Sequence, residues 1–236
     1  MLETMAPGAL SNLDLSKAVL AIGSLGTASY GVVDVTKCFG GGVSNRGFSD
    51  ITKVVTKFIP ASATGTETSG LGSASALATL RANWINGMAL PDQKAAAKAL
   101  VKLNLTETTA PQMAAAAGVD ASVLTDIAKK LGSTAALLPQ ETDIYGRFDL
   151  MLTALLDQGY QRADQRYRNS AKLLAVPIAV LLALLGVWGI GGNQTTAADL
   201  WRALLAGLLA TPLAPVAKDL SSAIQAGAKL AQSWKK

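Results

Sequence analysis

Apolar segments alternate with amphipathic ones along the chain, and the longest apolar segment is Leu173–Gly192. It has 20 residues and no charged side chain. At about 1.5 Å of rise per residue, a helix of this length covers about 30 Å, which is the thickness of the hydrocarbon core of a bilayer. The pattern therefore predicts a transmembrane helix over 173–192.

A shorter apolar segment near the N-terminus, Ala18–Val33, has 16 uncharged residues between Lys17 and Asp34. As a helix it covers about 24 Å, slightly less than the core of a bilayer. We expect a first transmembrane helix at about 18–36. The alternatives that the sequence leaves open are a helix buried in protein, a re-entrant helix and a signal peptide cleaved near Ala28.

The last apolar segment, Ala203–Ala217, has 15 uncharged residues and contains two prolines. With its flanks it predicts a third transmembrane helix over 201–217, which forms a hairpin with 173–192. Pro212 and Pro215 lack the backbone N–H that a helix uses, so we expect them to bend this helix or to limit its depth. The sequence leaves open whether the first and last segments span the membrane fully or re-enter it.

Small residues recur every four positions in the first and last apolar segments. In a membrane this spacing lets helix backbones approach closely, and packing rather than hydrophobic exclusion holds such helices together. The candidate helix-packing residues are Gly23, Thr27 and Gly31 in the first segment and Ala206, Ala210 and Ala214 in the last, where Ala203, Gly207 and Thr211 form a second stripe.

The region between the first two apolar segments has helical periodicity and no alternating pattern typical of strands. Residues 43–139 therefore predict a small all-α domain. Gly40–Gly42 predicts a turn before this domain, and the Ser/Thr/Gly-rich stretch 61–75 predicts a flexible loop within it. The expected helices are 48–58, 76–88, 91–103, a short helix capped by Thr109 that ends at Ala117, and a helix capped by Asp120 that ends at Lys130.

A strongly charged amphipathic segment, Asp143–Lys172, leads directly into the longest apolar segment. Acidic residues precede basic ones by four positions in Asp143–Arg147 and Asp164–Arg168, the spacing of stabilising pairs on a helix. We expect one long helix that begins in the aqueous domain and continues through the membrane, so that 140–217 comprises this helix and the hairpin. Residues 218–236 predict a basic amphipathic tail.

Charges and aromatic residues that flank the apolar segments predict the orientation of the chain. Basic residues near membrane spans favour the cytoplasmic side, and Trp favours the headgroup level. The candidate interface residues are Arg162, Arg166, Arg168, Lys172, Trp188, Trp201, Arg202 and Lys218. Since the loop 191–199 has no Lys or Arg, we expect this loop and the N-terminus outside, and the helical domain and the C-terminus in the cytoplasm. A topology in which only the C-terminal hairpin is inserted also satisfies the charge rule.

Composition agrees with an integral membrane protein. The 236 residues are 50% hydrophobic and only 16% charged, whereas about a quarter of residues are charged in a typical soluble domain. The net charge of +5 comes without a basic patch interleaved with aromatic residues, so we expect no nucleic-acid partner. Cys38 is the only cysteine, which excludes an intramolecular disulfide, and histidine is absent.

A search for catalytic and ligand-binding motifs finds none, and we expect no catalytic residue, metal site or cofactor. The chain contains no GxxxxGK[ST], no CxxC and no GxSxG. Asp149, Asp157 and Asp164 on the long helix are the type of residue that usually lies on a solvated face. No charge lies well inside an apolar segment, so the sequence indicates no ion or proton path.

Both ends of the chain resemble a family of uncharacterised bacterial integral membrane proteins. The resemblance rests on Tyr145–Asp149, Asp157, Arg162–Tyr167 and Pro215–Leu220, and on Tyr30–Asp34 with Gly40–Ser44 near the first segment. It implies an N-terminal span, a cytoplasmic helical region and a C-terminal span hairpin, in the bacterial inner membrane. It implies no activity.

Two hypotheses of function follow. The first is a non-enzymatic scaffold or anchor that assembles through its small-residue faces, as a homo-oligomer or within a larger membrane complex, and presents the helical domain to the cytoplasm. The second is an oligomeric channel or transport protein, in which several copies line a conduit with Ser24, Thr27, Ser29 and Tyr30. A membrane enzyme is a third possibility, and it would need a carboxylate or the Cys38 thiol as its working group.

Overall fold

A computed structural model describes residues 15–59, 72–133 and 135–233, and within these ranges all regular secondary structure is helical. This confirms the all-α fold class. Most of the expected flexible loop 61–75 lies outside the described residues, and its last three residues begin a helix. The chain divides into two compact units, which are described separately: Gly41–Arg168, called here the helical unit, and Met1–Gly40 with Asn169–Lys236, called the apolar unit.

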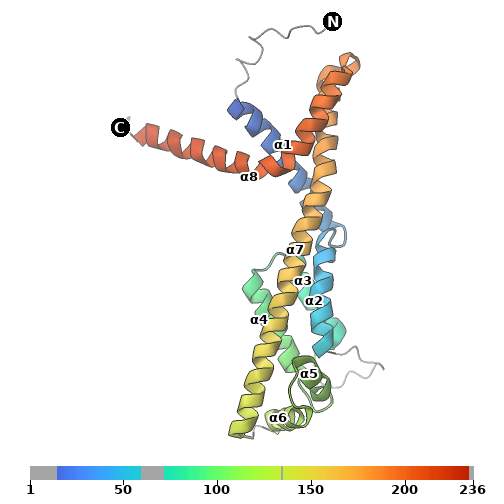
Figure 1. The fold of residues 1–236 in the computed structure, drawn as a ribbon, viewed down its shortest axis with the longest axis vertical. Coiled ribbons are helices and arrows are strands. Elements are labelled where there is room, and N and C mark those ends of the chain that lie inside the picture. The colour runs from blue at the N-terminus through green and yellow to red at the C-terminus, as the bar shows by residue number, and fades with distance from the viewer. Residues whose placement is uncertain (1–14, 60–71, 134, 234–236) are drawn as a thin grey trace. The chain divides into compact units, whose positions relative to one another are not determined.

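The helical unit contains five complete helices and the first part of a sixth (Figure 1). Their bounds are α2 Ser44–Phe58, α3 Ser73–Ile85, α4 Leu90–Leu103, α5 Ala110–Ala117, α6 Ala121–Ser133 and α7 Pro139–Gly191. Each predicted helix of this region is therefore present, with ends that differ by up to four residues. Gly40, Gly41 and Gly42 have φ values of +70°, +98° and +47°, which confirms the predicted glycine turn before α2.

The core of the helical unit is built around one face of α7. Phe148, Leu152, Leu156 and Tyr160 recur every four residues on this helix and are at most 2% exposed. They pack in one cluster with side chains of α2 to α6, and the ring of Phe58 on α2 meets Phe148 edge-on at 6.3 Å. Since the first thirty residues of α7 complete this core, the helical unit extends to Arg168.

Helix ends in this unit show which polar residues act as caps. Asp120 accepts hydrogen bonds from the backbone N–H groups of Ser122 and Val123 at 2.9 and 3.0 Å, as predicted for a cap. The prediction for Thr109 is wrong in detail. Its side chain does not cap α5 but accepts from the Thr106 N–H and donates to the Asn104 carbonyl, so it fixes the turn before the helix.

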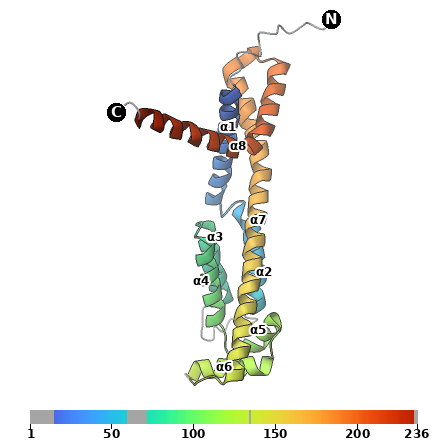
Figure 2. The same ribbon diagram turned by 60° about the vertical axis from the view of Figure 1, so that its left-hand side comes forward.

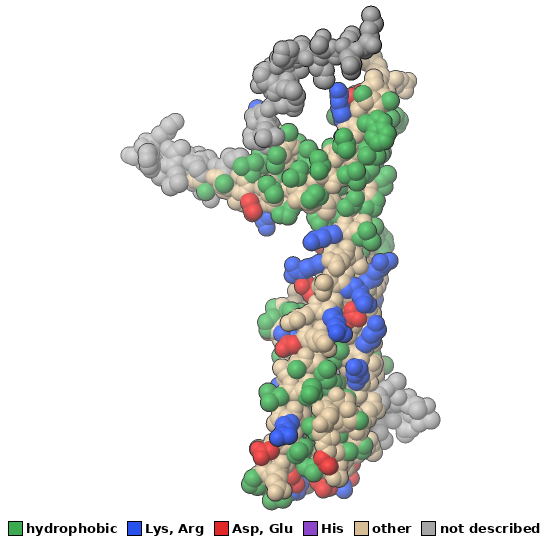
Figure 3. Space-filling view, viewed as in Figure 1, with side chains coloured by type: hydrophobic (Ala, Val, Ile, Leu, Met, Phe, Trp, Pro, Cys, Tyr) green, Lys and Arg blue, Asp and Glu red, His purple; other side chains and the backbone are tan. Residues whose placement is uncertain are grey.

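The apolar unit contains α1 Leu15–Val35, the short 3-10 helix η1 Thr36–Cys38, the rest of α7, the 3-10 helix η2 Gly192–Gln194 and α8 Ala197–Ser233. Three helices of the described chain, α1, α7 and α8, are long and apolar enough to cross a membrane, which confirms the predicted membrane class. Hydrophobic side chains cover much of the visible surface of this unit, and charged ones lie mainly over the helical unit (Figure 3). Two views show that α8 bends part-way along its length (Figures 1 and 2), as its two internal prolines predict.

Candidate functional site

The first candidate site is a seam of small residues inside the apolar unit. On α8, Ala203, Gly207, Ala210, Ala214 and Ala217 are buried. Their spacing alternates between four and three residues, which averages 3.5 and keeps one face of a helix in contact with its neighbours. Polar or bulky side chains are almost excluded from this face, so the helices pack through their backbones.

The contact between α1 and α8 depends on two glycines. A Cβ on Gly23 would lie 2.0 Å from the Cβ of Ala217, and a Cβ on Gly26 would lie 2.1 Å from the carbonyl oxygen of Ala210. Residue numbers rise along α1 as they fall along α8, so the two helices are antiparallel where they cross. Only glycine fits at both positions, because any side chain would push the backbones apart.

The contact between α7 and α8 has the same character. A Cβ on Gly207 would lie 2.5 Å from the Cα of Val180 on α7. On α7 itself, Ala171, Ala175 and Ala179 are at most 7% exposed. Sequence reasoning missed these three alanines, although their four-residue spacing was the available signal.

The structure brings together only part of the predicted packing set. Gly23, Ala210 and Ala214 lie in the seam, and Ala206 is half-buried at its edge. Thr27 and Gly31 are exposed, and no atom lies within 4 Å of a Cβ built on Gly31.

The rotation of successive residues along a helix explains why Thr27 and Gly31 do not contact α8 within one copy. At about 100° per residue, Gly31 lies about 140° from Gly26 around α1. The contact follows Gly23, Gly26 and Ser29 instead, which turns the exposed residues Thr27 and Gly31 away from α8. The sequence pattern does not identify Gly26, because Gly26 lies outside the four-residue repeat of Gly23, Thr27 and Gly31.

Hydroxyl groups in the apolar unit mostly bond to their own helix. Ser24 Oγ donates to the Leu20 carbonyl at 2.7 Å and Thr27 Oγ1 to the Gly23 carbonyl at 3.0 Å. Ser29 is fully buried and donates to the Gly26 carbonyl at 2.7 Å. The hydroxyls predicted to line a conduit therefore do not share one exposed face in a single copy of the chain.

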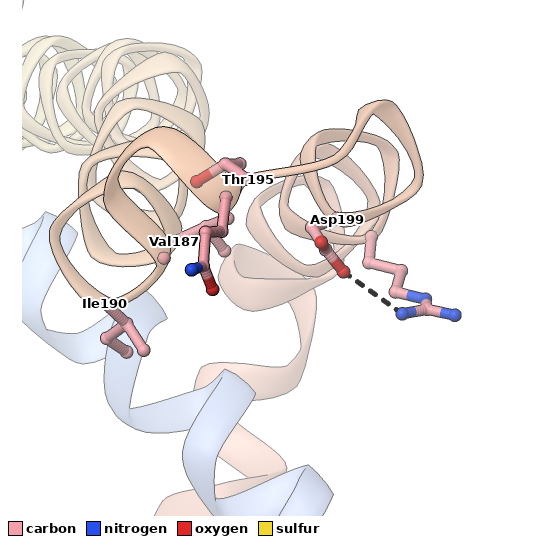
Figure 4. Close-up of a pocket in the computed structure, with 7 residues that line it drawn as sticks. Val187, Ile190, Thr195 and Asp199 are labelled. Atoms are coloured by element: carbon pink, nitrogen blue, oxygen red, sulfur yellow. Dashed lines mark hydrogen bonds and ion pairs between the residues drawn. The ribbon is translucent and has the colours of Figure 1, made fainter.

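A small pocket of about 310 Å³ lies at the turn between α7 and α8 (Figure 4). Asp199 anchors this turn: its carboxylate accepts from the N–H and the hydroxyl of Thr196, and the Thr196 hydroxyl accepts from the Asp199 N–H. This is a reciprocal cap of α8. Arg202 also lines the pocket, and its Nη1 lies 3.2 Å from Asp199 Oδ1.

A larger apolar groove of about 570 Å³ lies along the hairpin, and it is lined by leucines of α7 and α8 together with Trp188 and Trp201. Both tryptophans are about two-thirds exposed, at 65% and 66%. Lys172 and Lys218, two other predicted interface residues, are also exposed. In a membrane this surface faces lipid or another helix. An apolar surface without polar groups does not distinguish between these two neighbours.

A second candidate site is a polar contact between α4 and α7 in the helical unit. Lys98 Nζ lies 2.7 Å from Asp149 Oδ2, Lys102 pairs with the other oxygen of Asp149, and Lys94 Nζ lies 2.6 Å from Asp157 Oδ1. Asp149 and Asp157 are expected on a solvated face, and their side chains remain 27% and 42% exposed, but each also pairs with lysines of α4. Burial opposes ionisation of Asp149, but hydrogen bonds from Lys102 and Lys98 outweigh it and lower the pKa of the carboxyl.

Further charges have structural partners. Asp164 and Arg168 form the predicted pair at 2.8 Å. Both carboxylate oxygens of Glu141 accept hydrogen bonds from Lys130 Nζ, at 2.6 and 2.7 Å. One of them also accepts from the backbone N–H of Leu138 at 2.7 Å. These hydrogen bonds, the one from Lys130 first, lower the pKa of Glu141.

No group of three or more metal-ligating side chains occurs in the part of the chain that the structure describes. The charged groups above pair acids with lysines or arginines, either between two helices, as in Lys98–Asp149, or within one, as in Asp164–Arg168. Comparisons of the chain with protein-family models, with curated proteins and with solved structures found no match.

Proposed function

We propose that the chain is a non-enzymatic membrane anchor or scaffold that holds its helical unit at the cytoplasmic face of a bacterial inner membrane. The observation that carries this proposal is α7, a single helix of 53 residues. Its first part supplies the core of the helical unit through Phe148, Leu152 and Leu156, and its last part is the longest apolar segment of the chain. A continuous helix transmits position and orientation better than a flexible linker does.

The proposed orientation places the N-terminus outside and both the helical unit and the C-terminus in the cytoplasm. What supports it is the charge on the two sides of the α7–α8 hairpin. Four basic residues, Arg162 to Lys172, precede the apolar part of α7, whereas the turn at 192–198 has none.

Self-assembly is the second part of the proposal. One small-residue face of α1 packs in the seam within a single copy. A second face, which consists of Ser24, Thr27, Ala28 and Gly31, is exposed. These residues follow the i, i+3, i+4, i+7 pattern, so they form one stripe on which a helix of another copy can pack closely.

Cross-linking and sizing test the assembly. We expect the full chain in a mild detergent to elute as an oligomer, and Gly31→Leu to shift it toward the monomer because the added side chain separates the helices. Val32→Leu is the matched control, since Val32 is 45% exposed and already bulky. A monomer at every concentration, or an oligomer unaffected by Gly31→Leu, contradicts assembly through this stripe.

An oligomeric pore is the alternative function, and the exposed hydroxyls of Ser24 and Thr27 on the same stripe favour it. Several copies that meet through α1 would place these hydroxyls at a shared axis. Flux measurements on liposomes that contain the full chain distinguish the two functions, because a scaffold leaves the membrane tight.

A further inference from the structure

Arginines gather at one end of the helical unit. Five of the six arginines in this unit lie at the start of α2, on the last turns of α3, or on α7 just before the unit ends. They are Arg46 on α2, Arg81 on α3, and Arg162, Arg166 and Arg168 on α7. On the face drawn in Figure 3, basic side chains are concentrated at one end of this unit. The sixth arginine, Arg147, lies near the opposite end of the α7 part of the unit.

Packing around Trp84 fixes this arginine-rich end. Trp84 Nε1 donates to the Ser44 carbonyl at 2.9 Å, and its ring meets that of Tyr167 edge-on at 6.2 Å. A Cβ on Gly47 would lie 2.6 Å from the Ala163 carbonyl oxygen and 2.8 Å from Trp84. The ends of α2, α3 and α7 are therefore in direct contact, which gathers their arginines at one end of the unit.

Polar contacts hold two of these arginines in place. Arg81 Nη2 donates to Asn45 Oδ1 at 3.0 Å. Arg166 donates to Ser49 Oγ at 3.2 Å, and its Nε lies 3.2 Å from Oδ2 of the buried Asp50. Such contacts fix a guanidinium in advance, which lowers the entropy lost when it binds a ligand.

Charge is unevenly divided between this end and the rest of the unit. Five arginines against Asp50 and Asp164 give the end a formal charge of +3, whereas the rest of the helical unit has eight basic and nine acidic residues. Arg46 and Arg162 are exposed, and neither guanidinium forms an ion pair within the described residues. Their charge is available to a ligand.

The type of basic residue also differs between the two regions. Lysines of the helical unit neutralise its own acids, as Lys94, Lys98 and Lys130 do. Arginine dominates the charged end, and its planar guanidinium binds two phosphate oxygens at once, which the ammonium of lysine does not. The surface therefore has the chemistry of a phosphate-binding site.

Connectivity indicates where this surface meets phosphates. The chain enters the unit at Gly41 and leaves it after Arg168, and the contacts of Gly47 show that both points lie at the arginine-rich end. Along α7, Arg166 precedes Leu173, the first residue of the apolar segment, by seven residues or about 10 Å. The headgroup layer is about 5 to 8 Å thick on each side of a bilayer, so an extended arginine side chain that points toward the membrane reaches it from this position.

We propose that the arginine-rich end of the helical unit binds the phosphodiester groups of anionic lipids, such as phosphatidylglycerol, at the membrane surface. The proposal requires that the apolar part of α7 lies in a membrane, and it does not depend on self-assembly or on the absence of a pore. It assigns these arginines a ligand in addition to their effect on orientation.

Lipid titration of the full chain in a mild detergent tests the proposal, with bound lipids counted by native mass spectrometry. We expect phosphatidylglycerol to bind more tightly than phosphatidylcholine. The double variant Arg46→Gln/Arg162→Gln should weaken the binding of phosphatidylglycerol about thirtyfold, from about a factor of five for each charge removed at a membrane surface. Arg46→Lys/Arg162→Lys should restore only part of it.

Arg147→Gln, compared with the single variant Arg162→Gln, is the matched control, because each removes one positive charge from the same unit and only Arg162 belongs to the proposed surface. Equal loss in this variant, or no preference for phosphatidylglycerol, overturns the proposal.

Displacement of the lipid by millimolar inorganic phosphate would indicate a site for free phosphate instead and also overturns it. Binding of a single-stranded RNA oligonucleotide that depends on Arg46 and Arg162, with lipid binding unchanged, would identify the partner as nucleic acid and has the same consequence. Circular dichroism checks that each variant retains its helical content.

Discussion

Gly26 on α1 lies directly against the backbone of Ala210 on α8: a Cβ on Gly26 would be 2.1 Å from the Ala210 carbonyl oxygen. No rotation of a side chain relieves such a contact, because both partners are backbone or Cβ atoms. The two helices therefore approach as closely as they do only because residue 26 is glycine.

Gly26→Ala should destabilise the apolar unit by about 1 to 3 kcal/mol, since the added methyl forces the helices apart. Unfolding of the full chain in detergent micelles, followed by circular dichroism as SDS is added, measures this change. Gly186→Ala on α7 is the control, because nothing lies within 4 Å of its Cβ position and alanine favours a helix. Equal stability of the two variants would contradict the contact between α1 and α8.

Asp149→Asn should destabilise the helical unit by about 1 to 2 kcal/mol, because it removes the acceptor that Lys98 and Lys102 share. This loss is at the lower end of the range for charged hydrogen bonds, because both lysines are about one-third exposed and therefore remain partly hydrated. Thermal unfolding followed by circular dichroism gives the change. Asp143→Asn, at an exposed position on the same helix, should have little effect.

Acid should weaken the helical unit through Asp149 and Glu141. The folded state lowers the pKa of both carboxyls, so it binds fewer protons than the unfolded state near pH 4. Their stabilising contribution is complete above the unfolded pKa values of about 4 and is lost as the pH falls through the lower folded values. The melting temperature measured from pH 7 to pH 2 should fall in this acidic range.

The double variant Asp149→Asn/Glu141→Gln isolates this effect. It should melt at a lower temperature than the parent at pH 7, with a smaller further decrease as the pH falls. A pH dependence as steep as that of the parent would show that other carboxyls control acid unfolding. Lys102 has its pKa raised, because the hydrogen bond to Asp149 outweighs its burial, so its contribution is lost only in strong alkali and does not affect this range.

Cys38 provides a direct test of orientation. It is the only cysteine of the chain and is exposed just after α1. With the proposed topology, a membrane-impermeant maleimide should label it in inverted inner-membrane vesicles and not in intact cells. Labelling in intact cells would place the end of α1 outside and contradict the orientation. A Cys38→Ser variant with a cysteine at Asn193, in the turn after α7, should show the reverse labelling.

Sequence patterns sufficed for the helices and for the membrane class. Periodicity of apolar residues locates α2 to α6, and the uncharged lengths of three segments identify the helices long enough to span a membrane. These properties are local, since they depend on residues within a few helical turns of one another. For the same reason the Asp120 cap and the glycine turn at 40–42 were predictable.

Contacts between distant residues were decided by the tertiary structure. Gly23 and Gly31 have the same residue type and similar neighbours along the chain, yet only Gly23 lies against α8. The sequence pattern places Asp149 on a solvated face of its helix, whereas in the structure two lysines of α4 pair with it. Five arginines from three helices lie at one end of the helical unit because Trp84 and Gly47 join the ends of those helices. Periodicity tells which residues share a face of one helix, but which face meets which partner depends on how the whole chain packs, and no local pattern encodes that choice.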